Sequence, residues 1–229
     1  QNFYPKYDRQ SDIYAGLVSD IEKGLSLLDE TKEPVEGDVL YGGDITRWKR
    51  FGNSLLLRFG MRMEKADPAQ SRSLVTKAVQ GGVMQSAGDI CMVQHVEGKA
   101  STENPLGYVF KSHGLLVSGA IKISKTFMDR LKSTNDPRMQ VYCALPDGDT
   151  ARDKQKGLPN GYDLLTISSG DPTYTSLPDY STFNPATLLL LNAPTIYMVH
   201  AEVELLQAEA ILKGYISGDA KAHYENAVR

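Results

Sequence analysis

Four aromatic side chains are candidates for ligand binding, because they lie in a long segment whose composition is typical of loops. The segment, residues 145–195, is rich in Pro, Gly, Ser and Thr, and its aromatic residues argue against disorder. An aromatic face packs well against the apolar ring hydrogens of a sugar, and binding residues concentrate on loops held by a rigid scaffold. The candidates are Tyr162, Tyr174, Tyr180 and Phe183, with Asn160 as a hydrogen-bonding neighbour.

Polar side chains of the same segment could complete such a site by hydrogen-bonding to sugar hydroxyls. They are Asn160, Asp163, Asp171, Asp179 and Asn184. A simpler interpretation is that the aromatic rings only pin the loop to the helices beneath it. The sequence leaves both interpretations open.

Residues that could support catalysis or hold a metal do not form a recognisable set. The four histidines are scattered, at His95, His113, His200 and His223. None of them has the ligand spacing typical of a zinc site, and the sequence has no phosphate-binding loop and no Gly-x-Ser-x-Gly elbow. We therefore expect a protein that is not an enzyme and carries no cofactor.

Two pairs of acidic residues could in principle support catalysis or bind a metal ion. Glu202/Glu204 and Asp147/Asp149 could serve glycoside hydrolysis, but a solvated helix face and a polar turn are simpler explanations. The Asp147-Gly148-Asp149 turn could also hold a structural Ca²⁺ through its oxygens.

The composition is that of an ordinary globular domain. Of the 229 residues, 41% are apolar, and 25 basic against 28 acidic side chains give a net charge of −3, which argues against nucleic-acid binding. The longest apolar run, Leu188 to Leu191, is far too short to span a membrane. Cys91 and Cys143 are either two buried thiols or, if the protein is secreted, a disulfide.

Residues 11–82 have the periodicity of three helices. The first begins at Ser11 or Asp12, the second runs from about Asp44 to Lys65, and the third follows Asp67-Pro68 and ends at Gly81-Gly82. The second helix carries one apolar stripe, made of Ile45, Trp48, Phe51, Leu55, Phe59 and Met63. Trp48 lies on this stripe, so we expect it in the core rather than in a sugar site.

Residues 83–194 lose this periodicity and form a loop-rich region, with one helix expected near 124–134 after the cap Ser124 and a short strand between Val83 and Val96. Residues 195–229 are again helical. Leu55 to Val79 aligns with Glu204 to Val228 without a gap, each copy being a helix, a short turn and a second helix. The two units, 11–82 and 195–229, are similar to the hairpins of tetratricopeptide repeats.

Several motifs in the same order resemble those of the SusD/RagB-like outer-membrane lipoproteins. They are Gly42-Gly43-Asp44 with Trp48, Phe51 and Asn53-Ser54-Leu55; Ala78-Val79-Gln80-Gly81-Gly82; Ser124 to Asn135-Asp136-Pro137-Arg138; Gly157-Leu158-Pro159-Asn160-Gly161; and Ala201-Glu202-Val203-Glu204 with Gly218-Asp219-Ala220. The chain departs from the family pattern at Gly52 and Gly60, where Ala is usual, and at His200.

The resemblance implies a mainly α fold of tetratricopeptide-like hairpins with a long irregular region, forming a single SusD-like domain over residues 1–229. It also implies a lipid-anchored protein on the outer face of the outer membrane, which binds nutrient and passes it to a TonB-dependent transporter of the SusC type. The expected ligand is a glycan, with an oligopeptide as the nearest alternative and a pure protein-interaction scaffold as another. Neither cysteine is expected to carry the lipid anchor, and the full protein is expected to continue at both ends.

Overall fold

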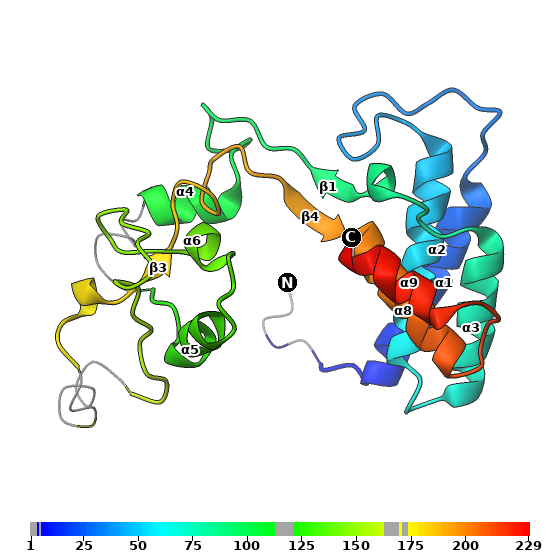
Figure 1. Ribbon diagram of the computed structural model, residues 1–229. Coiled ribbons are helices and arrows are strands. Elements are labelled where there is room, and N and C mark those ends of the chain that lie inside the picture. The colour runs from blue at the N-terminus through cyan, green and yellow to red at the C-terminus, as the bar shows by residue number, and fades with distance from the viewer. Residues whose placement is uncertain (1–3, 5, 113–120, 163–169, 171–173) are drawn as a thin grey trace. The chain divides into compact units, whose positions relative to one another are not determined.

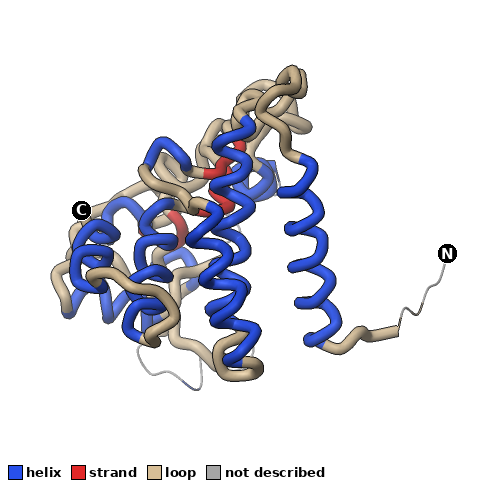
Figure 2. Tube along the Cα trace, turned by 90° about the vertical axis from the view of Figure 1, so that its right-hand side faces the viewer, coloured by secondary structure: helices blue, strands red, loops and turns tan. Residues whose placement is uncertain are grey.

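The computed structural model describes residues 4, 6–112, 121–162, 170 and 174–229, and the chain divides into two compact units (Figure 1). Unit 1 comprises Gln1–Val93 and Ile196–Arg229, and unit 2 comprises Gln94–Thr195. The described residues are mainly helical and their strands are short, as Figure 2 shows, so the predicted mainly α class is confirmed. None of the helices in the described part of the chain is long and apolar enough to cross a membrane.

Unit 1 contains five helices and one pair of short strands among its described residues. They are α1 (Gln10–Leu27), α2 (Ile45–Arg62), α3 (Pro68–Gly81), α8 (His200–Leu212) and α9 (Ala220–Val228), with β1 (Cys91–Val93) paired to β4 (Thr195–Met198) and the short 3-10 helix η1 (Ala87–Asp89) before β1. The helices α2 and α3 form one hairpin, and α8 and α9 form another.

The predicted helix caps are confirmed for α2 and α3 but not for α1. The Asp44 side chain accepts from Arg47 N at 3.0 Å, and the Asp67 side chain accepts from Gln70 N at 2.9 Å, with Pro68 in the first turn. The first helix instead begins at Gln10 without a side-chain cap, so the expected start at Ser11 or Asp12 is wrong.

Helix α2 is the centre of unit 1, and it is buried on more than the one face that the sequence predicted. The predicted stripe, including Trp48 and Phe51, is only partly buried and packs against the core. Leu56 and Leu57, which do not belong to the stripe, are both 0% exposed. The stripe was correct as an apolar face, but further elements cover the rest of α2.

Two glycines of α2 allow its neighbours to approach closely. A Cβ on Gly52 would lie 2.7 Å from Leu25 Cδ2 of α1, and a Cβ on Gly60 would lie 2.9 Å from Val75 Cγ2 of α3. The absence of a methyl group at Gly52 and at Gly60 therefore lets α1 and α3 lie this close to α2.

Polar side chains of α2 fasten it to segments far away in the sequence. Asn53 Nδ2 donates to Gly81 O at 2.8 Å, and thereby satisfies a free carbonyl at the C-terminal end of α3. Arg58 donates from Nε and Nη2 to the two carboxylate oxygens of Glu202 on α8, at 2.6 and 2.7 Å. Glu202 therefore belongs to a bidentate ion pair rather than to a freely solvated face.

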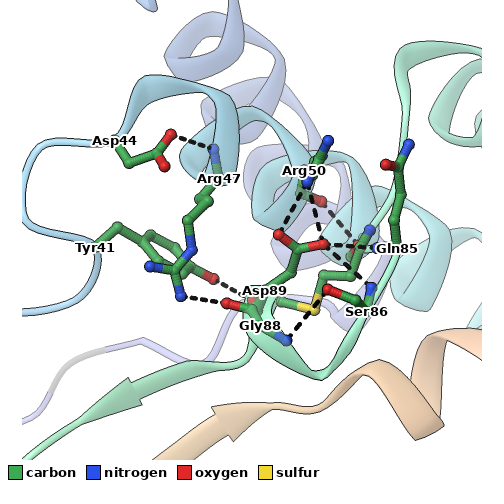
Figure 3. Close-up of polar contacts among 10 residues, drawn as sticks. Tyr41, Asp44, Arg47, Arg50, Gln85, Ser86, Gly88 and Asp89 are labelled. Carbon is green, nitrogen blue, oxygen red and sulfur yellow. Dashed lines mark hydrogen bonds and ion pairs between the residues drawn. The ribbon is translucent and has the colours of Figure 1, made fainter.

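Figure 3 shows a second polar network, which joins α2 to the segment that precedes β1. The Asp89 carboxylate, 5% exposed, accepts from Arg50 Nη1 at 3.1 Å and from Gln85 N at 2.8 Å. Burial alone would raise the pKa of Asp89, but the hydrogen bonds from Gln85 and Arg50 outweigh it and hold the pKa below its usual value. The Tyr41 hydroxyl donates to Asp89 O at 3.0 Å and closes the network.

A buried carboxylate of α8 joins the two helices of the α8 and α9 hairpin through His223 of α9. Glu204, 7% exposed, lies 3.0 Å from His200 Nε2 and 2.8 Å from His223 Nδ1. The Asp219 side chain caps α9 by accepting from Lys221 N at 2.9 Å. Neither member of the Glu202/Glu204 pair is therefore a free carboxylate.

Unit 2 is built around short elements. They are α4 (Pro105–Ser112), α5 (Lys125–Ser133), α6 (Met139–Tyr142), β2 (Cys143–Ala144), the 3-10 helix η2 (Leu177–Asp179) and β3 (Thr182–Phe183). The helix expected near 124–134 is α5, and Ser124 caps it by accepting from Phe127 N at 3.2 Å; α4 and α6 are additional. Strands β2 and β3 are antiparallel, with Cys143 opposite Phe183.

The two cysteines are free thiols, and each is buried in a different unit. Cys91 lies in the core of unit 1, and Cys143 lies in a core with Met128 and Leu131 of α5. Burial raises the pKa of the Cys143 thiol to about 11. Each thiol is therefore a natural reporter of opening in its own unit.

Replacing Gly60 by Ala should destabilise unit 1 by about 1–3 kcal/mol, because the added methyl group would collide with Val75 and push α3 away. The matched control is Gly24→Ala in α1, where a Cβ would have no neighbour within 4 Å. That change should stabilise the helix by about 0.5–1 kcal/mol. Denaturant unfolding followed by Trp48 fluorescence measures both, and equal effects of the two substitutions would contradict the packing described.

Replacing Asp89 by Asn should cost about 2 kcal/mol of stability at pH 7, since Arg50 loses its carboxylate partner. The pKa of Asp89 is lowered in the folded state, so its stabilisation is complete above the unfolded-state value of about 3.9 and is lost as the pH falls through the folded-state pKa. The difference between wild type and D89N should therefore shrink below about pH 4. Urea unfolding at pH 7, 5 and 3 measures it, with Asp44→Asn as a near-neutral control because Asn also caps helices. A difference that stayed constant with pH would contradict this role.

Candidate ligand-binding surface

The predicted binding segment is anchored to α5 by a glycine that permits backbone contact. Lys125 N donates to Leu158 O at 2.7 Å, and Leu158 N donates to Ile123 O at 2.8 Å. A Cβ on Gly157 would lie 2.6 Å from Lys125 Cα and 2.7 Å from Ser124 O, so only Gly fits between the two segments. The Gly-Leu-Pro-Asn-Gly motif thus fixes the loop on the start of α5.

A buried hydrogen-bond chain adds the stretch after η2 to this platform. Ser181 N donates to Lys156 O at 2.8 Å, and Ile123 N donates to Ser181 O at 2.8 Å. The Ser181 hydroxyl donates to Gln155 Oε1 at 2.8 Å, and Gln155 Nε2 donates to Asp149 O at 2.9 Å. Because Ser181 and Gln155 are buried and paired, the position of the neighbouring Tyr180 is well determined.

Tyr174 and Tyr180, two of the predicted residues, are brought together as a stacked pair. Their ring centres are 5.9 Å apart and their planes differ by 16°. Lys156 Nζ lies 4.4 Å from the centre of the Tyr180 ring, within the range of a cation–π interaction. Tyr180 itself is 0% exposed, so its ring packs against that of Tyr174 and does not face a ligand directly.

A small hollow opens beside Tyr180. It has a volume of about 100 Å³, and Tyr180, Lys156 and three α5 side chains (Lys125, Asp129 and Lys132) are part of its lining. The Tyr180 hydroxyl is buried and has no hydrogen-bond partner among the described residues. Lys125 and Asp129 form an ion pair one helical turn apart. We call this space the lysine hollow.

The other predicted residues have different surroundings. Tyr162 is 41% exposed and its hydroxyl donates to Gly170 O at 2.9 Å, and Asn160 is exposed. Phe183 packs edge-on against Phe110, with ring centres 5.7 Å apart, so it contributes to the core. Tyr162, Tyr174 and Asn160 thus keep access to solvent, and their binding role stays a prediction.

The polar residues named with them also divide into structural and surface positions. Asn184 is buried and donates from Nδ2 to Gln140 O at 2.8 Å, while Asp179 is exposed and accepts from the Ser176 hydroxyl at 2.9 Å. Asp163 and Asp171 lie outside the described residues.

The carboxylates of the Asp147–Asp149 turn bond to groups within the same short segment. Asp147 Oδ1 accepts from Asp149 N at 3.0 Å, and Asp149 accepts from Ala151 N at 2.7 Å and pairs with Lys154 Nζ at 2.5 Å. Across the described ranges, no cluster of three or more His, Cys, Asp or Glu side chains could hold a metal ion. The geometry is that of the polar turn, which was the simpler of the two interpretations.

The lysines of the hollow are not predicted by any motif of the sequence, although the spacing of some of them is informative. Lys125, Asp129 and Lys132 are spaced by four and three residues, which places them on one face of α5. Lys156 joins them only through the contact at Gly157, and that contact could not be inferred from spacing.

Replacing Gly157 by Ala should destabilise unit 2 by about 2–3 kcal/mol, because a Cβ would overlap backbone atoms of α5 that cannot move independently. The measurement is thiol labelling in sub-denaturing urea, read separately for each cysteine by mass spectrometry. Cys143 in unit 2 should react at least about tenfold faster than in the wild type. Cys91 in unit 1 is the internal control, and an unchanged rate at Cys143 would contradict the close approach.

Comparison with known proteins places this architecture in a family. A SusD-like family model, described as starch-binding and associating with the outer membrane, matches residues 1–229. No curated protein matches the chain.

Solved structures agree with that assignment. A chitin-binding protein is 27% identical with a TM-score of 0.74, covering 98% of this chain and 48% of its own. A SusD homolog from Bacteroides fragilis is 26% identical with a TM-score of 0.73, again covering 98% and 48%. A SusD homolog from Bacteroides vulgatus is 27% identical with a TM-score of 0.75, covering 99% and 45%.

The chain thus spans about half the length of these structures. Because the family model matches it from end to end, the chain belongs to the SusD-like family of outer-membrane-associated proteins.

Proposed function

We propose that this chain is part of a non-catalytic glycan-binding protein at the cell surface. The observation that carries the proposal is the match of the SusD-like model, described as starch-binding, over residues 1–229. Two similar structures are chitin-binding proteins by name, one of them a SusD homolog from Flavobacterium johnsoniae. These descriptions favour a carbohydrate over a peptide as the ligand.

Within the chain, the surface of unit 2 around Tyr174 suits this role best. The Tyr174 ring is held parallel to the buried Tyr180 ring, so it costs little entropy to present one fixed aromatic face. The exposed Tyr162 and Asn160 follow the Gly157 anchor and supply a second ring and an amide for sugar hydroxyls. Binding by aromatic faces and a few hydrogen bonds gives modest affinity, which suits capture followed by release.

The last step of the proposed role is delivery of the bound ligand to a transporter. The complete protein is held at the outer membrane by a lipid anchor and passes its ligand to a TonB-dependent transporter. This step rests on the family alone, since the chain covers about half of the similar structures. Co-purification of the complete protein with an outer-membrane transporter tests it, and recovery with a soluble partner alone would favour an interaction scaffold.

The ligand class is tested by calorimetric titration of the chain with starch, chitin and other oligosaccharides, and with a peptide pool. At least one oligosaccharide should bind saturably, with a Kd of roughly micromolar to millimolar. Tyr174→Ala should weaken that binding about five- to tenfold, because it removes the aromatic contact.

The matched control for this test is Tyr224→Ala, which removes an exposed tyrosine from α9 in unit 1 and should leave binding unchanged. Saturable peptide binding without any sugar binding would refute the glycan proposal. Turnover of a bound oligosaccharide would refute the non-catalytic part of it.

A further inference from the structure

A cavity of unit 1 lies between the start of α1, the end of α2 and the start of α3. Its volume is about 360 Å³, within the range of about 300–1,000 Å³ that is usual for small-ligand pockets. Its described lining comes from unit 1 alone and includes Gln10 and Tyr14 of α1, Arg62 and Met63 at the end of α2, and Gln70 of α3. We call it the unit 1 cavity.

Part of the lining is apolar and is held by packing against the helices. The Tyr14 ring packs edge-on against Phe59 of α2, with ring centres 5.8 Å apart and planes at 72°. Met63 packs against the core of unit 1, and Ala15 and Ala66 add two small apolar side chains to the lining. These groups offer a contact surface for an apolar side chain, and little of it has to be ordered on binding.

The unit 1 cavity also has one positive and one negative side chain, which are not within ion-pair distance of each other. Arg62 and Asp67 are the only charged groups in its described lining, and neither takes part in an ion pair with another described residue. The Asp67 carboxylate accepts from Gln70 N at 2.9 Å through Oδ1, as the cap of α3. Both side chains are exposed, at helix ends whose dipoles favour their charges, so both are available to a ligand.

A ligand that carries both signs of charge satisfies these two groups best. Charge-assisted hydrogen bonds are roughly twice as strong as neutral ones, so a carboxylate at Arg62 and an ammonium at Asp67 would gain more than two sugar hydroxyls. A simple anion or a simple cation would pair with one of the two groups and be repelled by the other. With the apolar lining, these requirements describe an α-amino acid that has an apolar side chain.

The size of the unit 1 cavity agrees with this class of ligand. Because a water molecule takes up about 30 Å³ of liquid volume, a space of about 360 Å³ corresponds to about twelve waters and accepts a whole leucine or phenylalanine molecule. The exposed Gln10 and Gln70 amides line the same space and supply neutral donors and acceptors.

We propose that the unit 1 cavity binds a free α-amino acid with an apolar side chain. The carboxylate of the amino acid pairs with Arg62, its ammonium pairs with Asp67, and its side chain lies against Tyr14 and Met63. The inference is independent of glycan binding, which we place on the surface of unit 2, so the two proposals can fail separately.

The test is an NMR titration of the ¹⁵N-labelled chain with L-leucine, in which the amide shifts give both the affinity and the place of binding. L-Leucine should bind saturably, with a Kd of roughly 1 mM, and should shift amides at the start of α1, the end of α2 and the start of α3. N-Acetyl-L-leucine lacks the ammonium and L-leucine methyl ester lacks the carboxylate. Each should bind about three- to fivefold more weakly, because each loses one exposed ion pair.

Variants assign the two charges. Arg62→Gln should weaken leucine binding about three- to fivefold and leave binding of the methyl ester unchanged. Asp67→Asn, which keeps a side chain that caps helices, should weaken leucine binding equally and leave binding of N-acetyl-leucine unchanged. The matched control is Lys65→Gln, which removes an exposed charge outside the described lining and should change no affinity.

Several outcomes would overturn the inference. They are an absence of saturable leucine binding, shifts confined to unit 2, and a leucine affinity that neither Arg62→Gln nor Asp67→Asn changes. The same shifts in unit 1 with maltotriose would make the cavity a sugar subsite instead, and tighter binding of L-leucyl-L-leucine would replace the amino acid with a peptide. The surface around Tyr174 is tested separately, by its own variant and by oligosaccharide binding.

Discussion

The close packing of α2 against its neighbours is the constraint on which unit 1 depends. The helix contacts α1 across Gly52, α3 across Gly60 and α8 through the Arg58–Glu202 ion pair. Each contact has its own requirement: an absent methyl group in the first two, and a bidentate carboxylate in the third. A helix enclosed in this way cannot shift along its axis without breaking several of these interactions together, so α2 fixes the relative positions of both hairpins.

Unit 2 is held together with much less regular secondary structure than unit 1. Its long connecting segments are held by backbone hydrogen bonds to α5 and by buried polar pairs such as Ser181 with Gln155, instead of by long helices. The Gly157 contact brings the loop and the helix together. It places Tyr180 beneath Tyr174 and Lys156 beside the lysines of α5. The described residues that are fixed in this way can contribute to a binding surface without the entropy cost of ordering them first.

The long helices, and the caps of α2, α3 and α5, could be predicted from the sequence because local spacing determines them, whereas α4, α6 and the start of α1 could not. Asp44, Asp67 and Ser124 each precede a periodic run and each caps the helix that follows. The burial of Leu56 and Leu57 could not be read in the same way, since it depends on which elements cover α2. In the candidate site, too, contacts between distant segments could not be predicted from the sequence. The aromatic residues of the loop were recognised as a group, but the burial of Tyr180 and the position of Lys156 follow from hydrogen bonds between residues far apart in the sequence.

The most direct measurement of the central claim is hydrogen exchange by mass spectrometry, with and without a saturating oligosaccharide. The account predicts that bound glycan slows exchange in peptides covering residues 156–162 and 174–182, while peptides of α2 and α3 are unchanged. Protection confined to unit 1, with no change around Tyr174 and Lys156, would contradict it.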